Sequence, residues 1–385
     1  MSASPLADLV VLELASVLAG PSVGMFFAEH GARVVKVEAP VGDVTRRWHL
    51  AAEDPADTRP AYFCAVNWGK ESVVLDLASD EGRDALHRLA AHADLVVSSF
   101  RPGGATRLGA DADTLRALNP RLIVVEVDGY GPGDDRPGYD AVVQAEAGFT
   151  GLNGQSDGPP TKMPVALVDV LAAHQLKEAA LVALLARERT GQGATVRVSL
   201  LASAVASLAN QAANWLTAGV EPRRIGSAHP NIAPYGTPYP TATGDVVLAV
   251  GTDRQFAALA DVLGLAPDAR FATNADRVRA RDGLDAVLTA ALATRDREPF
   301  LAELGARGVP AGAVRSVPDV FAHPEAARLV VDDGDGHRAV RTVPGEARVL
   351  SPPPALGAHT RAVLAEVAGL DRAALDALAG PPGSP

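Results

Sequence analysis

Short apolar runs separated by longer amphipathic stretches recur along the first 130 residues. Residues 8–14 (DLVVLEL) and 33–38 (RVVKVE) are rich in β-branched residues and Leu, and between them lie a small-residue turn and an apolar stretch. This order predicts strand, helix and strand, the unit of a parallel sheet. The fold class expected is therefore α/β with an open, mostly parallel sheet. The same alternation predicts strands at 72–77, 95–98 and 121–127 and a helix at 80–91.

A loop rich in Gly, Pro and Asp follows at 129–138 (GYGPGDDRPG), and its composition predicts a connection. Loops at the ends of parallel strands commonly hold the sites of such folds. Beyond it a long Ala/Leu helix is expected over 170–189, because basic residues and then Gly191 end the pattern. A further apolar helix is expected over 200–216.

The pattern changes after residue 220. A segment rich in Pro, Gly and Asn at 221–243 predicts a crossing between domains, and one strand (VVLAV) followed by several helices predicts a smaller domain. After Pro352 two helical patterns predict a return to the first domain. The expected parts are 1–220 as the N-terminal part of a large domain, 221–325 as a small α+β domain with linkers, and 326–385 as the segment completing the large domain, with a disordered tail at 381–385.

Composition narrows the possible functions. Hydrophobic residues make up 48% of the chain and charged residues 21%, as in globular proteins. A formal net charge of -11 argues against nucleic acid or a membrane surface as partner, so an anionic ligand would need a local basic pocket. The single cysteine, Cys64, excludes an intrachain disulfide and a cysteine metal site. The N-terminal residues lack a signal-peptide pattern and no long apolar window occurs, so a cytoplasmic location is expected.

Three motifs resemble known sites but lack the required context. The turn after the first strand (ALAGPSVG) has no G-x-G-x-x-G, and Pro21 removes a backbone donor, which argues against a nicotinamide dehydrogenase. Residues 154–158 (GQSDG) match G-x-S-x-G, but no apolar strand precedes them, so a polar loop is favoured over a hydrolase nucleophile. His174 and Glu178 lie four residues apart without an H-E-x-x-H motif, so a solvated helix face is favoured over a metal pair.

Asp169 stands between an apolar run and the start of the long helix, at or near its N-cap. Free backbone N–H groups and the helix dipole would stabilise its carboxylate as an anion there. Taken alone, this position favours a structural helix cap over catalysis. A desolvated but ionised aspartate is also a competent nucleophile toward an activated acyl group.

Several segments, in order along nearly the whole chain, resemble the family III CoA-transferases, the carnitine and formyl-CoA transferase group. The segments are VLELASVLAGPSVGMFFAEHGARVVKVEAPVGD, NWGKESVVLDLASDEGRDALHRLAAHADLVVSSFRPG, LNPRLIVVEVDGYGPGDDRPGYDAVVQAEAG, LVDVLAAHQL, GQGATVRVSL, HPNIAPYG, RFATNADRV and PPPALGAHT. Each segment is weak by itself. The ordered set is specific.

The resemblance implies a Rossmann-like large domain made from both ends of the chain, a small domain between them, and an interlocked homodimer. It also implies that Asp169 is the catalytic aspartate of a CoA transfer from an acyl-CoA donor to a carboxylic acid, by way of an aspartyl anhydride and thioester. The expected partners are then acyl-CoA, small carboxylic acids and a second copy of the chain. A CoA thioester is the substrate, and no metal, flavin or nicotinamide cofactor is implied.

The resemblance also assigns residues around Asp169. Tyr139 and Asp140 end the Gly-rich loop in the motif GYD, where the family places active-site residues. The Tyr139 hydroxyl can donate to a developing oxyanion, or the ring can simply anchor the loop. Four cations at or after strand ends are candidates for binding the CoA phosphates, although each is also compatible with a solvated charge. They are Lys36, Lys70, Arg101 and Arg107, and Arg107 best matches a CoA-contacting arginine of the family.

The chain departs from the family at informative positions. Leu18 stands where formyl-CoA transferases have Gln, and their Gly-rich lid is absent from the sequence, which argues against formyl-CoA and oxalate. Ala39 replaces an expected Arg, which puts part of the adenine contact in doubt. The 2-methylacyl-CoA racemases share the fold but have His at the position of Tyr139, so a racemase or epimerase is the alternative function. A CoA-binding protein without turnover is a second alternative.

The segment around HPNIAPYG most resembles the branch of the family that uses dicarboxylates. Succinyl-CoA is therefore the donor expected from the resemblance. Arg223, Arg224 and His229 are candidates to meet a second carboxylate, or they serve in packing between domains.

Overall fold

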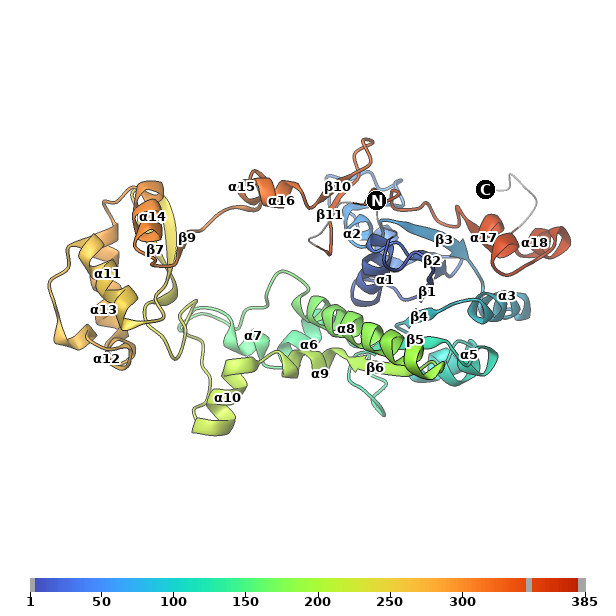
Figure 1. Cartoon of the computed structure of the whole chain (residues 1–385), viewed down its shortest axis with the longest axis horizontal. Coiled ribbons are helices and arrows are strands. Elements are labelled where there is room, and N and C mark those ends of the chain that lie inside the picture. The colour runs from blue at the N-terminus through green and yellow to red at the C-terminus, as the bar shows by residue number, and fades with distance from the viewer. Residues whose placement is uncertain (1–3, 344–347, 380–385) are drawn as a thin grey trace. The chain divides into compact units, whose positions relative to one another are not determined.

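The computed structural model of the chain describes residues 4–343 and 348–379 (Figure 1). Residue contacts divide the chain into two compact units. Unit 1 comprises Met1–Ala147, Pro164–Ala209 and Arg328–Pro385, and unit 2 comprises Gly148–Met163 and Asn210–Ala327. The tail 381–385 lies outside the described residues.

The sequence places residues 148–163 and 210–220 in the large domain, whereas in the structure they group with unit 2. A backbone hydrogen bond from Gly226 N–H to Gly154 O, at 3.1 Å, ties the first of these segments to the chain that follows residue 220. The Arg224 side chain donates to Gly151 O at 3.2 Å in the same place. Long-range bonds of this kind cannot be read from local composition.

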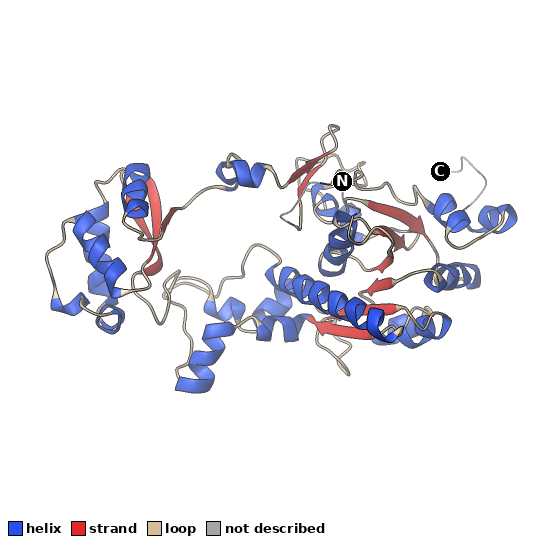
Figure 2. Ribbon diagram, in the orientation of Figure 1, coloured by secondary structure: helices blue, strands red, loops and turns tan. Residues whose placement is uncertain are grey.

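Unit 1 is built on a six-stranded sheet with the order β3-β2-β1-β4-β5-β6, in which every neighbouring pair is parallel (Figure 2). The predicted α/β fold is therefore confirmed. This is the doubly wound order, and its direction reverses between β1 and β4. The strands are β1 (Val10–Leu14), β2 (Arg33–Glu38), β3 (Lys70–Val74), β4 (Leu95–Ser98), β5 (Ile123–Asp128) and β6 (Thr195–Ser199).

Helices connect the strands and cover the sheet, and the return segment adds an antiparallel hairpin and two helices to unit 1. The helices are α1 (Ala19–Glu29), η1 (Val44–Arg47), α2 (Ala61–Cys64), α3 (Asp80–Ala91), α4 (Pro102–Arg107), α5 (Ala112–Leu118), α6 (Asp140–Glu146), α8 (Leu167–Thr190), α9 (Leu200–Ala206), α17 (Thr360–Glu366) and α18 (Arg372–Ala379). The hairpin strands are β10 (Val330–Asp332) and β11 (Arg338–Val340).

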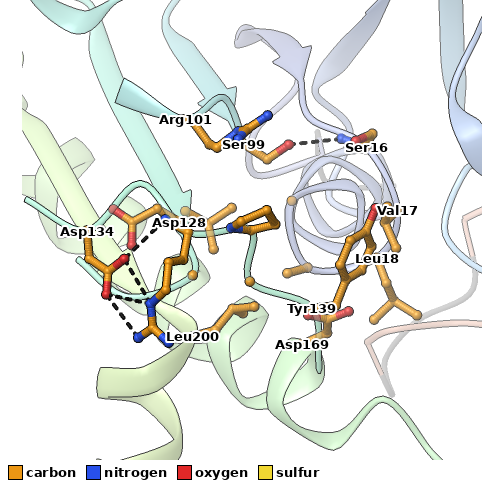
Figure 3. A pocket seen from close by; sticks show the side chains of 17 residues that line it. Ser16, Val17, Leu18, Ser99, Arg101, Asp128, Asp134, Tyr139, Asp169 and Leu200 are labelled. Carbon is orange, nitrogen blue, oxygen red and sulfur yellow. Dashed lines mark hydrogen bonds and ion pairs between the residues drawn. The ribbon is translucent and has the colours of Figure 1, made fainter. Parts of the chain in front are cut away.

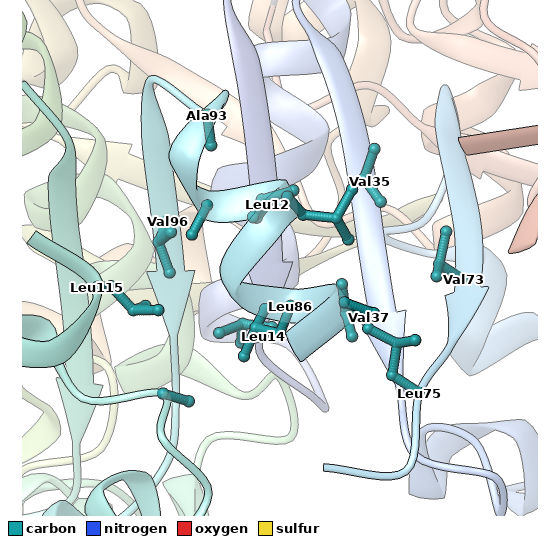
Figure 4. Close-up of a cluster of buried hydrophobic side chains, with 14 of the residues drawn as sticks. Leu12, Leu14, Val35, Val37, Val73, Leu75, Leu86, Ala93, Val96 and Leu115 are labelled. Carbon is teal, nitrogen blue, oxygen red and sulfur yellow. The ribbon is translucent and has the colours of Figure 1, made fainter. Parts of the chain in front are cut away.

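One face of the sheet carries a continuous apolar core (Figure 4). Alternate strand residues such as Leu12, Val35 and Val96 point to this face and are fully buried against Leu86 of α3. Val363 and Leu364 of α17 belong to the same core, so both ends of the chain build it. Burial of such side chains contributes about 1.5–3 kcal/mol each, which holds the return segment onto the sheet.

The opposite face of β1 and β2 carries charged residues beneath α1, because Glu13 and Lys36 alternate with the core positions. Helix α8 packs beside α1. It spans Leu167–Thr190 and ends at Gly191 in the left-handed conformation, as the sequence predicts. Its start lies three residues earlier than expected, which places Asp169 inside the first turn.

Unit 2 holds an antiparallel sheet of order β7-β8-β9 and a separate apolar core that includes Tyr239, Leu248, Leu284 and Phe300. Its strands are β7 (Tyr235–Thr241), β8 (Gly244–Ala249) and β9 (Ala311–Ala313). Its helices are α7 (Phe149–Leu152), α10 (Ala209–Ala218, whose first residue belongs to unit 1), α11 (Asp253–Leu263), η2 (Ala269–Phe271), α12 (Asn274–Arg279), α13 (Arg281–Leu292), α14 (Arg297–Ala306), α15 (Val317–Phe321) and α16 (Pro324–Ala327). Among the described helices, none has the length and hydropathy that a membrane crossing requires.

Candidate active site

A cavity of about 240 Å³ opens at the carboxyl ends of β1, β4 and β5, where the strand order reverses (Figure 3). Residues 16–20 line it after β1, Ser99 and Arg101 after β4, and Asp128 at the end of β5. Open α/β sheets bind ligands at this switch point, because the loops after neighbouring strands diverge there. The cavity therefore lies where the fold itself predicts a site.

Asp169 lines this cavity from the first turn of α8. Its side chain is 7% exposed, and Ala166, not Asp169, is the N-cap residue. Burial and, to a smaller extent, the nearby Asp140 carboxylate together raise the pKa of Asp169 to about 7. The helix N-terminus was expected to stabilise this carboxylate as an anion, whereas burial and a like charge raise its pKa above the ordinary value.

Asp140 is the first residue of α6 and is buried beside Asp169. Its Oδ1 accepts the Val168 backbone N–H at 2.8 Å, and its Oδ2 accepts Gln144 Nε2 at 2.8 Å. Asp140 thus satisfies one of the free N–H groups of the α8 first turn and fixes the backbone that carries Asp169.

Tyr139 also lines the cavity, and Figure 3 shows its ring beside Asp169. Its side chain is 53% exposed, so it is not a packed loop anchor. Gly129 and Gly138 close the base of the preceding loop. A Cβ on either glycine would overlap the other's Cα, so neither position tolerates a side chain. This closure brings the chain directly to Tyr139.

The four cations predicted to bind CoA phosphates divide into two pairs. Lys36 and Lys70 are 0% and 1% exposed. Both ammonium groups pair with the Glu13 carboxylate, Lys36 Nζ at 2.9 Å and Lys70 Nζ at 2.7 Å. Neither is therefore available to a phosphate. The prediction for these two residues is corrected: they belong to a buried ion network. Arg101 lines the cavity, and Arg107 is exposed in the last turn of α4.

Sequence reasoning missed several residues that shape the cavity. Ser16 N–H donates to Ser99 Oγ at 3.2 Å, which joins the loops after β1 and β4 across the switch point. Asp128 Oδ1 accepts the Gly131 N–H at 2.6 Å and starts the Gly-rich loop. Val17 adopts a positive φ of 71°. Ser16, Ser99 and Asp128 follow predicted strands closely, and this position was a sequence signal for a site at the sheet edge. Nothing in the sequence indicated the backbone conformation of Val17.

The remaining sequence candidates lie elsewhere. Residues 154–158 form a turn after α7 with no strand before it, and His174 and Glu178 are exposed on α8, as the sequence predicts. Within unit 2, His229 packs on the Tyr235 ring at a centroid distance of 5.2 Å. Ala39 is exposed after β2, and Leu18 lines the cavity.

Comparison with known proteins identifies the family. The family model for CoA-transferase family III matches residues 6–360. The chain is 38% identical to a succinate–glutarate CoA-transferase of Agrobacterium fabrum, over 96% of this chain and 97% of that protein. It is 34% identical to a mouse succinyl-CoA:glutarate CoA-transferase, over 98% and 89% of the two chains.

Solved structures agree with this result. A CAIB/BAIF family protein from Brucella suis superposes with a TM-score of 0.81 and 40% identity, covering 94% of this chain and 99% of that one. The chain belongs to CoA-transferase family III and is an acyl-CoA:carboxylate CoA-transferase.

Proposed function

We propose that Asp169 carries the transfer as a covalent nucleophile. Its carboxylate attacks the donor thioester carbonyl, the C–S bond breaks, and CoA leaves as the thiolate from a mixed anhydride. The thiolate then attacks the aspartyl carbonyl, which gives an aspartyl–CoA thioester and the donor carboxylate. The acceptor carboxylate reverses both steps, so no net proton or water is consumed. One difficult exchange becomes a series of acyl transfers.

The burial of Asp169 at the switch-point cavity is the observation that carries this proposal. A carboxylate with a pKa near 7 is a stronger base, and hence a stronger nucleophile, than a solvated one. The same burial limits the access of water, which would hydrolyse an anhydride. Other described carboxylates of the cavity, Asp128 and Asp134, bond to Gly131 and Arg136 instead.

Neighbouring residues have distinct roles in this proposal. The exposed Tyr139 hydroxyl donates to the oxyanion that forms when Asp169 attacks the thioester. Asp140 fixes the backbone position of Asp169 and adds to the rise in its pKa that burial causes, without reacting. Arg101 at the cavity and the exposed Arg107 attract the CoA phosphates, since guanidinium groups match phosphate geometry.

For the substrates we infer succinyl-CoA as donor and a dicarboxylate such as glutarate as acceptor. The names of the Agrobacterium and mouse relatives support this choice. A relative from Acetobacter aceti, 36% identical over 84% of each chain, is named acetyl-CoA:oxalate CoA-transferase, so oxalate belongs in the acceptor panel. A profile that favours monocarboxylates would contradict the dicarboxylate assignment.

A second copy of the chain completes the proposed enzyme as an interlocked homodimer. Two surfaces support this. Leu181, Val182 and Leu185 are exposed on α8, and Trp215 and Leu216 are exposed on α10. Large apolar side chains gathered on a helix commonly mark an interface. Light scattering after size-exclusion chromatography should give twice the chain mass at all accessible concentrations, and a concentration-independent monomer would contradict the assignment.

The test is a mass-spectrometric exchange assay in D₂O, with succinyl-CoA, a pool of carboxylic acids, wild-type enzyme and Asp169→Ala. New CoA thioesters that are lost in Asp169→Ala are the expected result. Thioesters that stay unchanged but gain α-deuterium would identify the racemase alternative. Binding without any change would identify a CoA-binding protein without turnover.

A further inference from the structure

Val17 has an unusual backbone conformation at the cavity. Its φ of +71° lies in the left-handed region, which β-branched residues rarely adopt. Val17 lines the cavity with Asp169, and the next residue, Leu18, is the N-cap of α1. Strain of this kind persists only where the surroundings enforce it, and it is concentrated at functional sites. Buried polar groups contact the backbone around Val17 and hold this turn.

Asp43 holds the turn from one side. Its Oδ1 accepts the Val17 N–H at 3.4 Å, the Thr45 N–H at 3.0 Å and the Thr45 hydroxyl at 2.8 Å. Asp43 is buried and follows β2, so its carboxylate reaches the turn after the neighbouring strand β1. The Val17 N–H is thereby turned toward Asp43.

Lys36 stabilises the same turn through Asp43 and through the backbone. Its Nζ contacts Asp43 Oδ2 at 2.9 Å and donates to the Ala15 carbonyl at 2.9 Å. One ammonium therefore joins the residue two positions before Val17 to the carboxylate that accepts the Val17 N–H. The remaining contact of Lys36, to Glu13 Oε1 at 2.9 Å, pairs it with the adjacent residue of β1.

Lys70 fixes the helix that follows the turn. Its Nζ contacts Glu13 Oε2 at 2.7 Å and donates to the Pro21 carbonyl, in the first turn of α1, at 2.9 Å. Helix α1 lies so close to Glu13 that a Cβ on Gly24 would overlap Glu13 Oε2. The network therefore bonds to the backbone on both sides of Val17 and Leu18, at Ala15 and at Pro21.

The network consists of two carboxylates and two ammonium groups in the dry interior. Burial lowers the pKa of Lys36, but the carboxylates of Glu13 and Asp43 raise it above its ordinary value. Burial likewise raises the pKa of Asp43, and Lys36 holds it below its ordinary range. Both groups are therefore ionised, and each loses its counter-charge if the other is neutralised.

We propose that Asp43 and Lys36 are positioning residues for CoA transfer, which hold Val17 in its left-handed conformation and so shape the cavity that Val17 and Asp169 both line. They touch no substrate. The inference rests on the proposed transfer reaction for its effect on turnover, but not for its effect on the backbone. Loss of the Asp43 charge is expected to let Val17 relax to a negative φ and to lower kcat more than it raises KM.

A double-mutant cycle tests the link to Val17. Asp43→Asn should lower kcat about tenfold, the size expected for loss of a hydrogen bond to a charged group, with a smaller change in KM. Glycine adopts positive φ without strain, so in the Val17→Gly background the same Asp43→Asn change should lower kcat about threefold or less. Equal losses in the two backgrounds, or an unchanged kcat, would overturn the proposal.

A control separates positioning from general destabilisation. Arg187 is buried and pairs with the half-buried Asp94 at 3.0 Å, at the far end of α8 from Asp169. Arg187→Met should lower the thermal midpoint comparably and leave kcat unchanged. If Asp43→Asn does not fold, Thr45→Val, which removes only the hydroxyl bond to Asp43, should lower kcat in the same direction. A parallel loss of kcat in Arg187→Met would overturn the proposal.

Hydrogen exchange of the intact protein gives a readout independent of turnover. Peptides covering residues 14–25 should exchange faster in Asp43→Asn, or in Thr45→Val, than in wild type, and Arg187→Met should not change them. Unchanged exchange there would overturn the inference even if the wild type transfers CoA. If the variants exchange faster than wild type but the wild type shows no transfer activity, only the proposed function is refuted.

Discussion

Asp140 Oδ1 accepts a hydrogen bond from the Val168 backbone N–H at 2.8 Å, one residue before Asp169. The Asp140 carboxylate thus holds the first turn of α8 and places a negative charge near Asp169, which lines the cavity. Burial and this charge together raise the pKa of Asp169 to about 7. Asp140 therefore fixes the position of Asp169 and adds to the effect of burial on its reactivity.

The rate of transfer should depend on the ionisation of Asp169. Only the carboxylate is nucleophilic, so kcat should rise with pH and level off above an apparent pKa of about 7. Initial rates of CoA exchange between pH 5 and 9, at saturating substrates, measure this. A profile that is flat from pH 5 to 8 would contradict the raised pKa.

Neutralising Asp140 should shift that profile. Asp140→Asn removes the like charge, so the pKa of Asp169 falls and the rise in kcat moves to lower pH. The Asn side-chain oxygen can still accept the Val168 N–H, which keeps the first turn of α8 in place. Glu146→Gln is the matched control, because Glu146 is exposed on α6 and pairs with Arg136. A shift of equal size in both variants would exclude a specific effect of Asp140.

Asp169 should also make stability fall as pH rises. Its folded pKa is raised above the ordinary value of 3.8, so its favourable contribution is complete below about pH 4 and is lost as pH rises through about 7. Asp169→Asn removes this loss and should be more stable than wild type at pH 8, by roughly 1–4 kcal/mol. Thermal denaturation of both proteins at pH 4 and pH 8 tests this; a variant less stable than wild type at pH 8 would contradict it.

The buried and exposed cations should respond differently to substitution. Lys70→Met leaves Glu13 with one ammonium partner in the dry interior and should cost about 3–5 kcal/mol of unfolding free energy. Arg101→Gln at the cavity should leave stability unchanged and raise KM for the CoA thioester about tenfold, the effect of one lost charged contact. Denaturant titrations and initial rates distinguish the two. A stable Lys70→Met with a raised KM would restore Lys70 as a CoA ligand.

Local sequence pattern predicted strands well where adjacent apolar residues form their centre, as in β2 and β4. The expected bounds of β2, β4 and α3 are those of the structure. Strand β6 was missed because the segment Thr195–Ser199 is short and half polar. Strand β7 was missed because Pro238 and Pro240 suggest a linker, yet β7 lies at the sheet edge, where proline is tolerated.

The expected helix over 200–216 is two helices, α9 and α10, because Ala209, at the start of α10, adopts a positive φ of 46°. No glycine or proline marks that break. Tertiary contacts decide such positions, and a single sequence does not display them.

The candidate site shows the same division. Asp169, Tyr139 and Arg101 were found from sequence and meet at one cavity. Lys36 and Lys70 were misassigned. For Lys36 a signal was present, because it lies in the middle of a predicted strand of a parallel sheet, and such strands are covered on both faces. A lysine in such a strand is better read as half of a buried ion pair. The raised pKa of Asp169 depends on burial and on Asp140 through a fold that local pattern does not specify.

Oxygen transfer to Asp169 tests the central claim most directly. Acceptor carboxylate labelled with oxygen-18 is mixed with succinyl-CoA and enzyme, and the peptide that contains Asp169 is weighed after proteolysis. If Asp169 forms the anhydride, one labelled oxygen remains on its carboxylate when CoA attacks the acceptor acyl group, so the peptide gains that mass only when both substrates are present. Turnover that leaves the Asp169 peptide unlabelled would contradict covalent transfer through Asp169.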